Sequence, residues 1–407
     1  MKQKLTACSV LISILLAGCN SGGDTNQAPN SATISNSTAP TNAADTQSSL
    51  TTTETKSIAS GTFHNLVITP SGELYVWGGN SNGQLGNGVT QDQAQSSKPS
   101  GLSSLVVAAD GGWEHSLALL ADGSVWAWGF NQYGQLGNGK LTDSLVPVRT
   151  VGLPKIKAIA AGLIHSLALS ETGQVWGWGT NTYGQLGNST TNLFGSTPVQ
   201  TPGLNNIIKI SAGQAHSLAL DANGHIWAWG GNESGQVGNG TNVHQLTPFL
   251  LPAPTNVVAI AAGALSSAAI TSDGHIWTWG DNRDGQLGDG TKTNRNTPKE
   301  IPGLTGVVDF CFKDHMLAVN KDGAVWAWGN NQGGKLGFGT PGVAVLSPQP
   351  VASLSGVQQV ACGALHSVAK KNDGSVWVWG ANNHLQLGNN GPIYSLTPYP
   401  VAGQIAR

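Results

Sequence analysis

A short motif, W-x-W-G, returns seven times along this chain at almost constant spacing. Successive copies are 49 to 51 residues apart, and only the first copy, Tyr75-Val76-Trp77-Gly78, departs from the motif. A unit of about fifty residues cannot bury an apolar face by itself, so the seven units are expected to stack into one continuous structure. The motifs end at Gly78, Gly129, Gly179, Gly230, Gly280, Gly329 and Gly380.

The third unit shows the strand pattern most clearly. Residues 157–162 and 165–169 are short apolar runs, and in residues 174–179 the alternation places two tryptophans on one side of a strand. A fourth strand is expected from about Thr197. In five other units an Asp-Gly or Asn-Gly pair stands between the second and third runs, which is a strong hairpin signal.

Four strands per unit, called A to D in chain order, are typical of a propeller blade. The sequence therefore predicts an all-β fold, a seven-bladed β-propeller of four-stranded blades, over residues 56–407. An open β-solenoid is the alternative, but it would need capping units with polar outer faces. The first and last units both keep the full pattern, which favours a closed ring.

The beginning of the chain carries a different signal. Two lysines precede an apolar run at residues 8–16, a pattern typical of a signal peptide and too short for a membrane span. The tetrad Leu16-Ala17-Gly18-Cys19 resembles the lipobox of bacterial lipoproteins. The resemblance implies that residues 1–18 are a lipoprotein signal peptide and that Cys19 is the lipid attachment site. The alternative is an ordinary secreted protein with a chance cysteine.

Residues 19–55 are rich in serine, threonine and asparagine and have almost no large apolar side chains. Such a stretch cannot offset its ordering entropy, so we expect a lipidated, flexible tether. By resemblance to enteric lipoproteins, Asn20 favours the outer membrane of a bacterial cell envelope, facing either the periplasm or the cell surface.

The charge content argues against nucleic acid as a partner. Charged residues make up 10% of the chain, and the formal net charge is −2 without a basic cluster. Nucleic-acid binding depends on neutralising many phosphates, which this composition does not provide. We expect a monomer whose partner is an unknown protein or another envelope component.

The repeat itself resembles a known family. The run G-x-x-H-S-x-A-L, followed by D-G-x-V-W-x-W-G-x-N-x-x-G-Q-L-G, is similar to the repeat of the regulator of chromosome condensation family, over residues 56 to about 403. Departures are local: Ser266 replaces the histidine of unit 5, unit 6 reads Phe312-Lys313-Asp314-His315-Met316, and unit 7 reads Leu385-Gln386-Leu387-Gly388.

This resemblance implies the seven-bladed fold and two possible activities. The founding eukaryotic member promotes guanine-nucleotide exchange on a small GTPase with a protruding β-wedge. A secreted bacterial β-lactamase inhibitory protein of similar architecture binds another protein. The longest span between the G-Q-L-G motif and the following D-strand proline, Gly86 to Pro99, is too short for a wedge, so we favour protein binding.

The repeated polar residues are expected to serve the fold. Equivalent histidines recur in six units, and equivalent positions on separate blades diverge around an axis instead of converging on a metal. We therefore predict that each histidine bonds to a neighbouring loop, and we predict no catalytic residue, metal site or cofactor. A lyase or glycan hydrolase is the enzyme alternative, and its only loop candidates are Asp281, Asp284 and His384. The histidines are His64, His115, His165, His216, His315 and His366.

Function is expected where the units differ. The A–B and C–D loops share one face of a propeller, and in units 1 to 3 they carry aromatic residues, which make good anchors for a protein partner. Unit 5 carries charges instead. The alternative is that the aromatic residues plug the channel mouth or pack on the next blade. The predicted binding residues are Phe63, Trp113, Phe130, Tyr133, Tyr183, Asp281 and Arg283.

Two cysteines remain beyond Cys19. Cys311 and Cys362 are 51 residues apart and occupy equivalent places in neighbouring units. They are either two small buried residues or a disulfide between adjacent blades, which an oxidising envelope would permit.

Overall fold

A computed structural model describes residues 56–401 of the chain. The predicted signal peptide, the predicted lipidation site Cys19 and the predicted tether up to residue 55 lie outside the described residues, as do residues 402–407. Within the described part no helix is long and apolar enough to cross a membrane.

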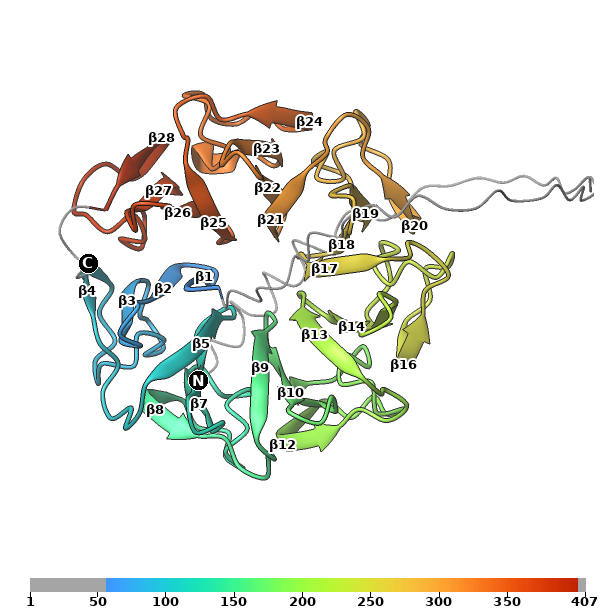
Figure 1. The fold of residues 1–407 in the computed structure, drawn as a ribbon. Coiled ribbons are helices and arrows are strands. Elements are labelled where there is room, and N and C mark those ends of the chain that lie inside the picture. The colour runs from blue at the N-terminus through green and yellow to red at the C-terminus, as the bar shows by residue number, and fades with distance from the viewer. Residues whose placement is uncertain (1–55, 402–407) are drawn as a thin grey trace, which may run out of the picture. The chain divides into compact units, whose positions relative to one another are not determined.

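Seven four-stranded antiparallel sheets form a closed ring, as Figure 1 shows. Each sheet consists of four consecutive strands in the order A-B-C-D, with A next to the central channel and D at the outer rim. The predicted all-β, seven-bladed propeller of four-stranded blades is confirmed, and the open solenoid is wrong.

The 28 strands fall into four equivalent sets. The A strands are β1 (Ile58–Ser60), β5 (Val106–Gly111), β9 (Ile156–Ala161), β13 (Ile207–Ala212), β17 (Val257–Ala262), β21 (Val307–Phe312) and β25 (Val357–Cys362). The B strands are β2 (His64–Ile68), β6 (His115–Leu120), β10 (His165–Ser170), β14 (His216–Asp221), β18 (Ser266–Thr271), β22 (His315–Asn320) and β26 (His366–Lys371).

The C strands are β3 (Leu74–Gly78), β7 (Val125–Gly129), β11 (Val175–Thr180), β15 (Ile226–Gly230), β19 (Ile276–Gly280), β23 (Val325–Gly329) and β27 (Val376–Ala381). The D strands are β4 (Gln93–Ser97), β8 (Ser144–Arg149), β12 (Phe194–Gln200), β16 (Gln245–Leu250), β20 (Arg295–Glu300), β24 (Val345–Pro350) and β28 (Tyr394–Pro400). In the described part of the chain one 3₁₀ turn, η1 (Gln332–Gly334), lies in the C–D loop of blade 6.

The hydrophobic core lies between the blades. Each blade packs one apolar face on its neighbour, as when Trp128 of blade 2 joins Leu66 and Leu85 of blade 1 in one buried cluster. The tryptophan directly before the final glycine of each motif is fully buried in this way. A blade therefore has no core of its own, which is the reason that the repeat must be stacked.

The ring closes without exchange of a strand between its first and last blades. Strands β1 to β4 form blade 1 and β25 to β28 form blade 7, so both are made from consecutive segments. Side chains join them: the His366 Nε2 donates to Asn65 Oδ1 at 2.7 Å, and the Trp77 Nε1 donates to the Gln386 carbonyl at 3.1 Å. The first and last blades therefore meet through a histidine bond and a tryptophan bond, with Asn65 in the place of the serine that receives the histidine in most other blades.

Candidate functional site

Alternating strand directions divide the loops between two faces. The A–B and C–D loops emerge on one side, here called the AB/CD face, and the B–C and D–A loops emerge on the other, the BC/DA face. The residues predicted to bind a partner all belong to loops of the AB/CD face.

The repeated histidines hold adjacent blades together. The His165 Nε2 lies 3.1 Å from the Oγ of Ser217 in the next blade, and that hydroxyl donates to the Gln185 carbonyl at 2.9 Å. Because the serine hydrogen is committed to Gln185, the imidazole nitrogen is the donor, which fixes the Nε2–H tautomer. The same contact recurs at His64, His115, His216 and His315.

Burial keeps these imidazoles neutral. Desolvation lowers the pKa of His165 to about 3, and the pKa values of His64, His115, His216 and His366 fall to about 3 mainly for the same reason. A fully buried, neutral ring that already donates to a neighbouring blade serves the fold. Within residues 56–401 no group of three or more histidine, cysteine or acidic side chains could hold a metal ion.

One junction lacks both partners of this contact. Between blades 5 and 6, Ser266 stands in place of the histidine and Met316 in place of the receiving serine. Both side chains are fully buried, and the Ser266 hydroxyl has no hydrogen-bond partner. Replacing both partners together avoids a buried imidazole without an acceptor, so the junction keeps its packing without this bond.

The repeated asparagines after W-G shape the C–D loops. The Asn80 Oδ1 accepts the N–H of Leu85 at 2.9 Å, and its Nδ2 donates to the carbonyls of Val89 and Gln91 at 3.0 Å. Equivalent bonds recur in the other blades, for example from the N–H of Leu136 to Asn131 Oδ1. This local network gives the repeated asparagines a structural role in the C–D loops.

Three of the predicted binding residues form one aromatic cluster on blade 2. The ring of Phe130 lies 5.8 Å from that of Trp113, edge to face, and 6.1 Å from that of Tyr133. Trp113 and Tyr133 are partly exposed, whereas Phe130 is only 6% exposed. Phe130 therefore supports its two neighbours, and Trp113 and Tyr133 are the members of this cluster with rings exposed to a partner.

Phe63 and Tyr183 each pack near the boundary with another blade. The Phe63 ring lies 4.5 Å from His384 of blade 7, whose Nδ1 is 2.9 Å from Asp92 Oδ2 of blade 1. The Tyr183 ring lies 4.9 Å from His244 of blade 4. Both aromatic rings remain partly exposed, so they join adjacent loops and still contribute to the AB/CD face.

The charged residues of blade 5 do not form a catalytic cluster. Asp281 is only 5% exposed and accepts bonds from Arg283 and Gln286, each at 2.8 Å. Asp284 accepts a bond from the Asn330 amide of blade 6 at 2.9 Å. Asp281 is therefore a buried loop support, whereas Arg283 is exposed and able to reach a partner.

An ion pair between a buried lysine and a half-buried aspartate distinguishes the A–B loop of blade 6. Lys335 replaces the glutamine of G-Q-L-G, and its Nζ contacts Asp314 at 2.7 Å and the Ala364 carbonyl of blade 7 at 2.8 Å. Burial alone would raise the pKa of Asp314, but Lys335 and His315 hold it down at about 2. This A–B loop is one residue shorter than the A–B loops of the other blades. The N–H of Lys313 donates to the carbonyl of His315, two residues further on, whereas in the other blades a glycine N–H donates to a carbonyl three residues further on.

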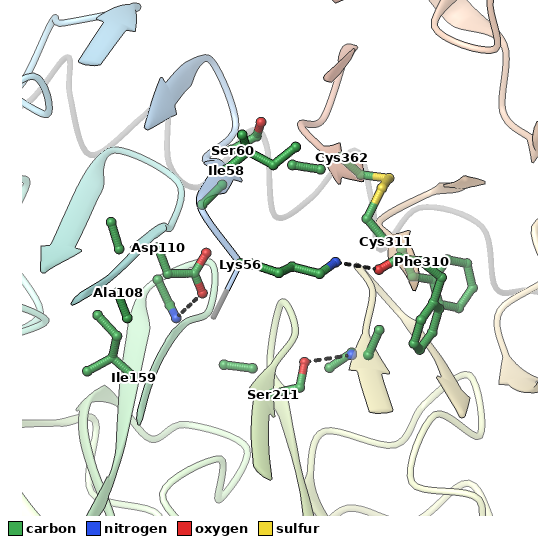
Figure 2. A pocket seen from close by; sticks show the side chains of 18 of the residues that line it. Lys56, Ile58, Ser60, Ala108, Asp110, Ile159, Ser211, Phe310, Cys311 and Cys362 are labelled. Carbon is green, nitrogen blue, oxygen red and sulfur yellow. Dashed lines mark hydrogen bonds between the residues drawn. A yellow bond between two sulfur atoms is a disulfide. The ribbon is translucent and has the colours of Figure 1, made fainter. Parts of the chain in front are cut away.

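The two cysteines meet at the wall of the central channel. Cys311 of β21 and Cys362 of β25 form a disulfide with Cα atoms 5.5 Å apart, as Figure 2 shows. The bond links the innermost strands of blades 6 and 7, and the alternative of two unlinked buried cysteines does not hold in this structure.

The most exposed apolar side chains of the AB/CD face are aliphatic and lie at the tips of the C–D loops. Sequence reasoning missed them because it concentrated on aromatic residues. The available signal was an aliphatic residue directly after Asn, Gly or Pro in four of these loops. They are Leu193, Val243, Val343 and Ile393, with exposed fractions of 69%, 72%, 77% and 69%.

Comparisons with known proteins agree with this architecture. The RCC1-like domain family matches residues 13–354 and 155–406. The ultraviolet-B receptor UVR8 of Arabidopsis thaliana is 37% identical over 192 residues, which cover 46% of this chain and 43% of UVR8. The matched part is thus less than half of that relative.

Solved structures show the same fold. Human WBSCR16 superposes with a TM-score of 0.74 at 25% identity, covering 81% of this chain and 93% of that one. Prp20p of Saccharomyces cerevisiae gives a TM-score of 0.74 at 24% identity, covering 83% and 88%. With seven blades of the expected repeat and a family match over most of its length, this chain belongs to the RCC1-like domain family.

Proposed function

We propose that this protein is a binding module that grips another protein with its AB/CD face while a lipid on Cys19 holds it in the outer membrane of a bacterial envelope. The observation that carries the binding role is the set of exposed apolar C–D loop tips on blades 3, 4, 6 and 7. Solvent-exposed aliphatic side chains on adjacent loops favour a protein contact, since each one buried contributes about 1.5–3 kcal/mol.

Blades 3 and 4 offer the best-defined part of this surface. Leu193 and Val243 stand on neighbouring C–D loops, and Phe194 follows Leu193 at the start of β12. The contact between Tyr183 and His244 holds the two loops together. Apolar tips beside a rigid, partly exposed aromatic ring match the composition of the centre of a protein interface.

The lipobox-like tetrad at residues 16–19 supports the anchor.

Nucleotide exchange is not proposed for this chain. Within residues 56–401 all 28 strands belong to the seven blades, and no additional β-ribbon protrudes from them. The feature that the exchange mechanism would require is therefore not found in the described part.

The experiment is an affinity capture from envelope fractions with the purified full-length chain as bait. A triple variant, Leu193→Ser, Phe194→Ser, Val243→Ser, removes the apolar tips of blades 3 and 4. Leu105→Ser is the matched control, because Leu105 is 57% exposed but lies in a D–A loop of the opposite face. We expect one protein to be retained by the wild type and the control, and to be lost with the triple variant.

Two results would contradict the proposal. Equal retention by the triple variant would remove these loops from the interface, and loss with Leu105→Ser alone would move the interface to the BC/DA face. Folding of each variant is checked by its thermal transition. The anchor is tested separately by replacing Cys19 with alanine, after which the protein should leave the membrane fraction.

A further inference from the structure

The central channel contains a cavity of about 330 Å³ that the proposed binding face does not use. Its walls are the A strands of all seven blades, and Figure 2 shows how their side chains surround it. Most lining residues are small or aliphatic, which leaves room in the middle of the ring. The charged residues among them are Lys56, Asp110, Lys157 and Lys313.

Two of these charges are matched by the protein itself. The Lys56 ammonium lies 2.8 Å from Asp309 Oδ1 and donates to the Phe310 carbonyl, also at 2.8 Å. The Asp110 carboxylate accepts the N–H of Ala161 at 2.8 Å and that of Gly111 at 2.9 Å. Each oxygen of Asp110 therefore already has a donor.

Lys313 is different. Its ammonium makes no hydrogen bond and no ion pair with any residue in the range 56–401, although its charge acts on Asp110 of blade 2 and on His64 and His115. Burial lowers the pKa of Lys313, and the fields of Asp110 and Asp314 only partly oppose that shift. An anion beside this desolvated ammonium would stabilise its charged form.

A second donor lines the same cavity. The Ser211 Oγ accepts the N–H of Ala262 at 2.9 Å, and its own hydrogen is not used within the described residues. The fold does not demand a lysine at 313, because the equivalent positions carry glycine. Lys313 and Ser211 thus line the cavity with donor hydrogens that no described residue uses, and such donors favour an anion.

We propose that the channel of this propeller binds a small oxyanion, a carboxylate or phosphate group, held between the Lys313 ammonium and the Ser211 hydroxyl. Asp110 limits the affinity, since its negative charge lines the same space. A zwitterion with an amino group is the competing ligand, because it would use Asp110 as a partner. Removal of the Asp110 charge separates the two, since it strengthens binding of a simple anion and weakens binding of a zwitterion.

The test is calorimetric titration of the full-length chain with inorganic phosphate and, separately, with acetate, in a chloride buffer of low ionic strength. We expect Lys313→Met to weaken binding by about tenfold or more, because a charge-assisted bond is lost. Lys313→Arg keeps the charge and should retain binding. Asp110→Asn should tighten it, and Lys321→Met, an exposed lysine at the other end of blade 6, should leave it unchanged.

The outcomes divide cleanly once the thermal transition shows that each variant is folded. Binding of either probe with this order of variants supports the channel site. The proposal is overturned if neither probe binds the wild type, if Lys321→Met weakens binding as much as Lys313→Met, or if Asp110→Asn weakens it. None of these residues lies at the C–D loop tips, so failure here leaves the proposed protein-binding role untouched.

Discussion

At the scale of single residues, the same position of the repeat stabilises the fold by a hydrogen bond in one blade and lacks that bond in another. His165 donates to Ser217 across a blade junction, whereas Ser266, at the equivalent position of blade 5, is buried without a hydrogen-bond partner. The cost of an alanine substitution therefore depends on whether the neighbouring blade supplies an acceptor.

We predict that His165→Ala lowers the free energy of unfolding by about 2 kcal/mol or more, because it removes a buried bond and leaves a cavity. Ser266→Ala should change it by less than about 0.5 kcal/mol or raise it, since an unsatisfied buried hydroxyl is removed. Urea unfolding followed by tryptophan fluorescence measures both variants. Equal costs at the two positions would show that the interblade bond contributes nothing.

At this scale, some roles of single residues could be predicted from the sequence and others could not. The structural roles of the histidines and asparagines follow from their recurrence in nearly every unit, which a single site would not need. The burial of Phe130 and Asp281 does not follow, since it depends on side chains that fold over them, namely Trp113 and Tyr133 for one and Arg283 and Gln286 for the other.

At the scale of the strand, the boundaries of the buried strands were predicted closely, whereas the start of the exposed D strand was not. In blade 3 the strands A, B and C begin and end within one residue of their expected positions. The D strand begins at Phe194 instead of about Thr197. Its side chains are mostly exposed or partly exposed, so the sequence carries little periodicity there, and pairing with β11 defines the strand instead.

The innermost strands of blades 6 and 7 are also linked covalently, which gives the second prediction. Replacing both Cys311 and Cys362 with alanine should lower the stability by about 2–4 kcal/mol, because the link closes a long loop in the unfolded chain. Thermal melting with and without a reductant measures the effect. The reductant should lower the transition of the wild type to that of the double variant and leave the variant unchanged. An unchanged wild type would show that the link does not stabilise the ring.

At the scale of the whole molecule, six buried histidines make the ring sensitive to acid. In the folded state five of their pKa values are about 3 and that of His315 is also lowered, whereas the unfolded chain has ordinary values near 6.5. The unfolded state therefore binds more protons, so this stability is complete above about pH 6.5 and falls as the pH drops toward 3.

From pH 7.5 to pH 5.5 each of the five histidines with a folded-state pKa of about 3 should remove about 1.4 kcal/mol from the free energy of unfolding. The urea midpoint should fall clearly over this interval, and His165→Ala should show a smaller fall than the wild type. A midpoint that does not move would contradict the neutral, buried state of these rings.

The contacts between blades all run in one rotational sense. Between blades 2 and 3, for example, His115 of blade 2 donates to Ser166 of blade 3. In the opposite direction, Ser166 and the buried Trp178 of blade 3 both donate to the Gln135 carbonyl of blade 2. Every junction is thus a head-to-tail contact between two unlike edges, and rotation closes the series. A ring divided between blades 3 and 4 would expose one edge of each kind on both fragments. Such halves are complementary by construction, and they should reassemble into the complete circle or, at high concentration, add to one another in longer chains.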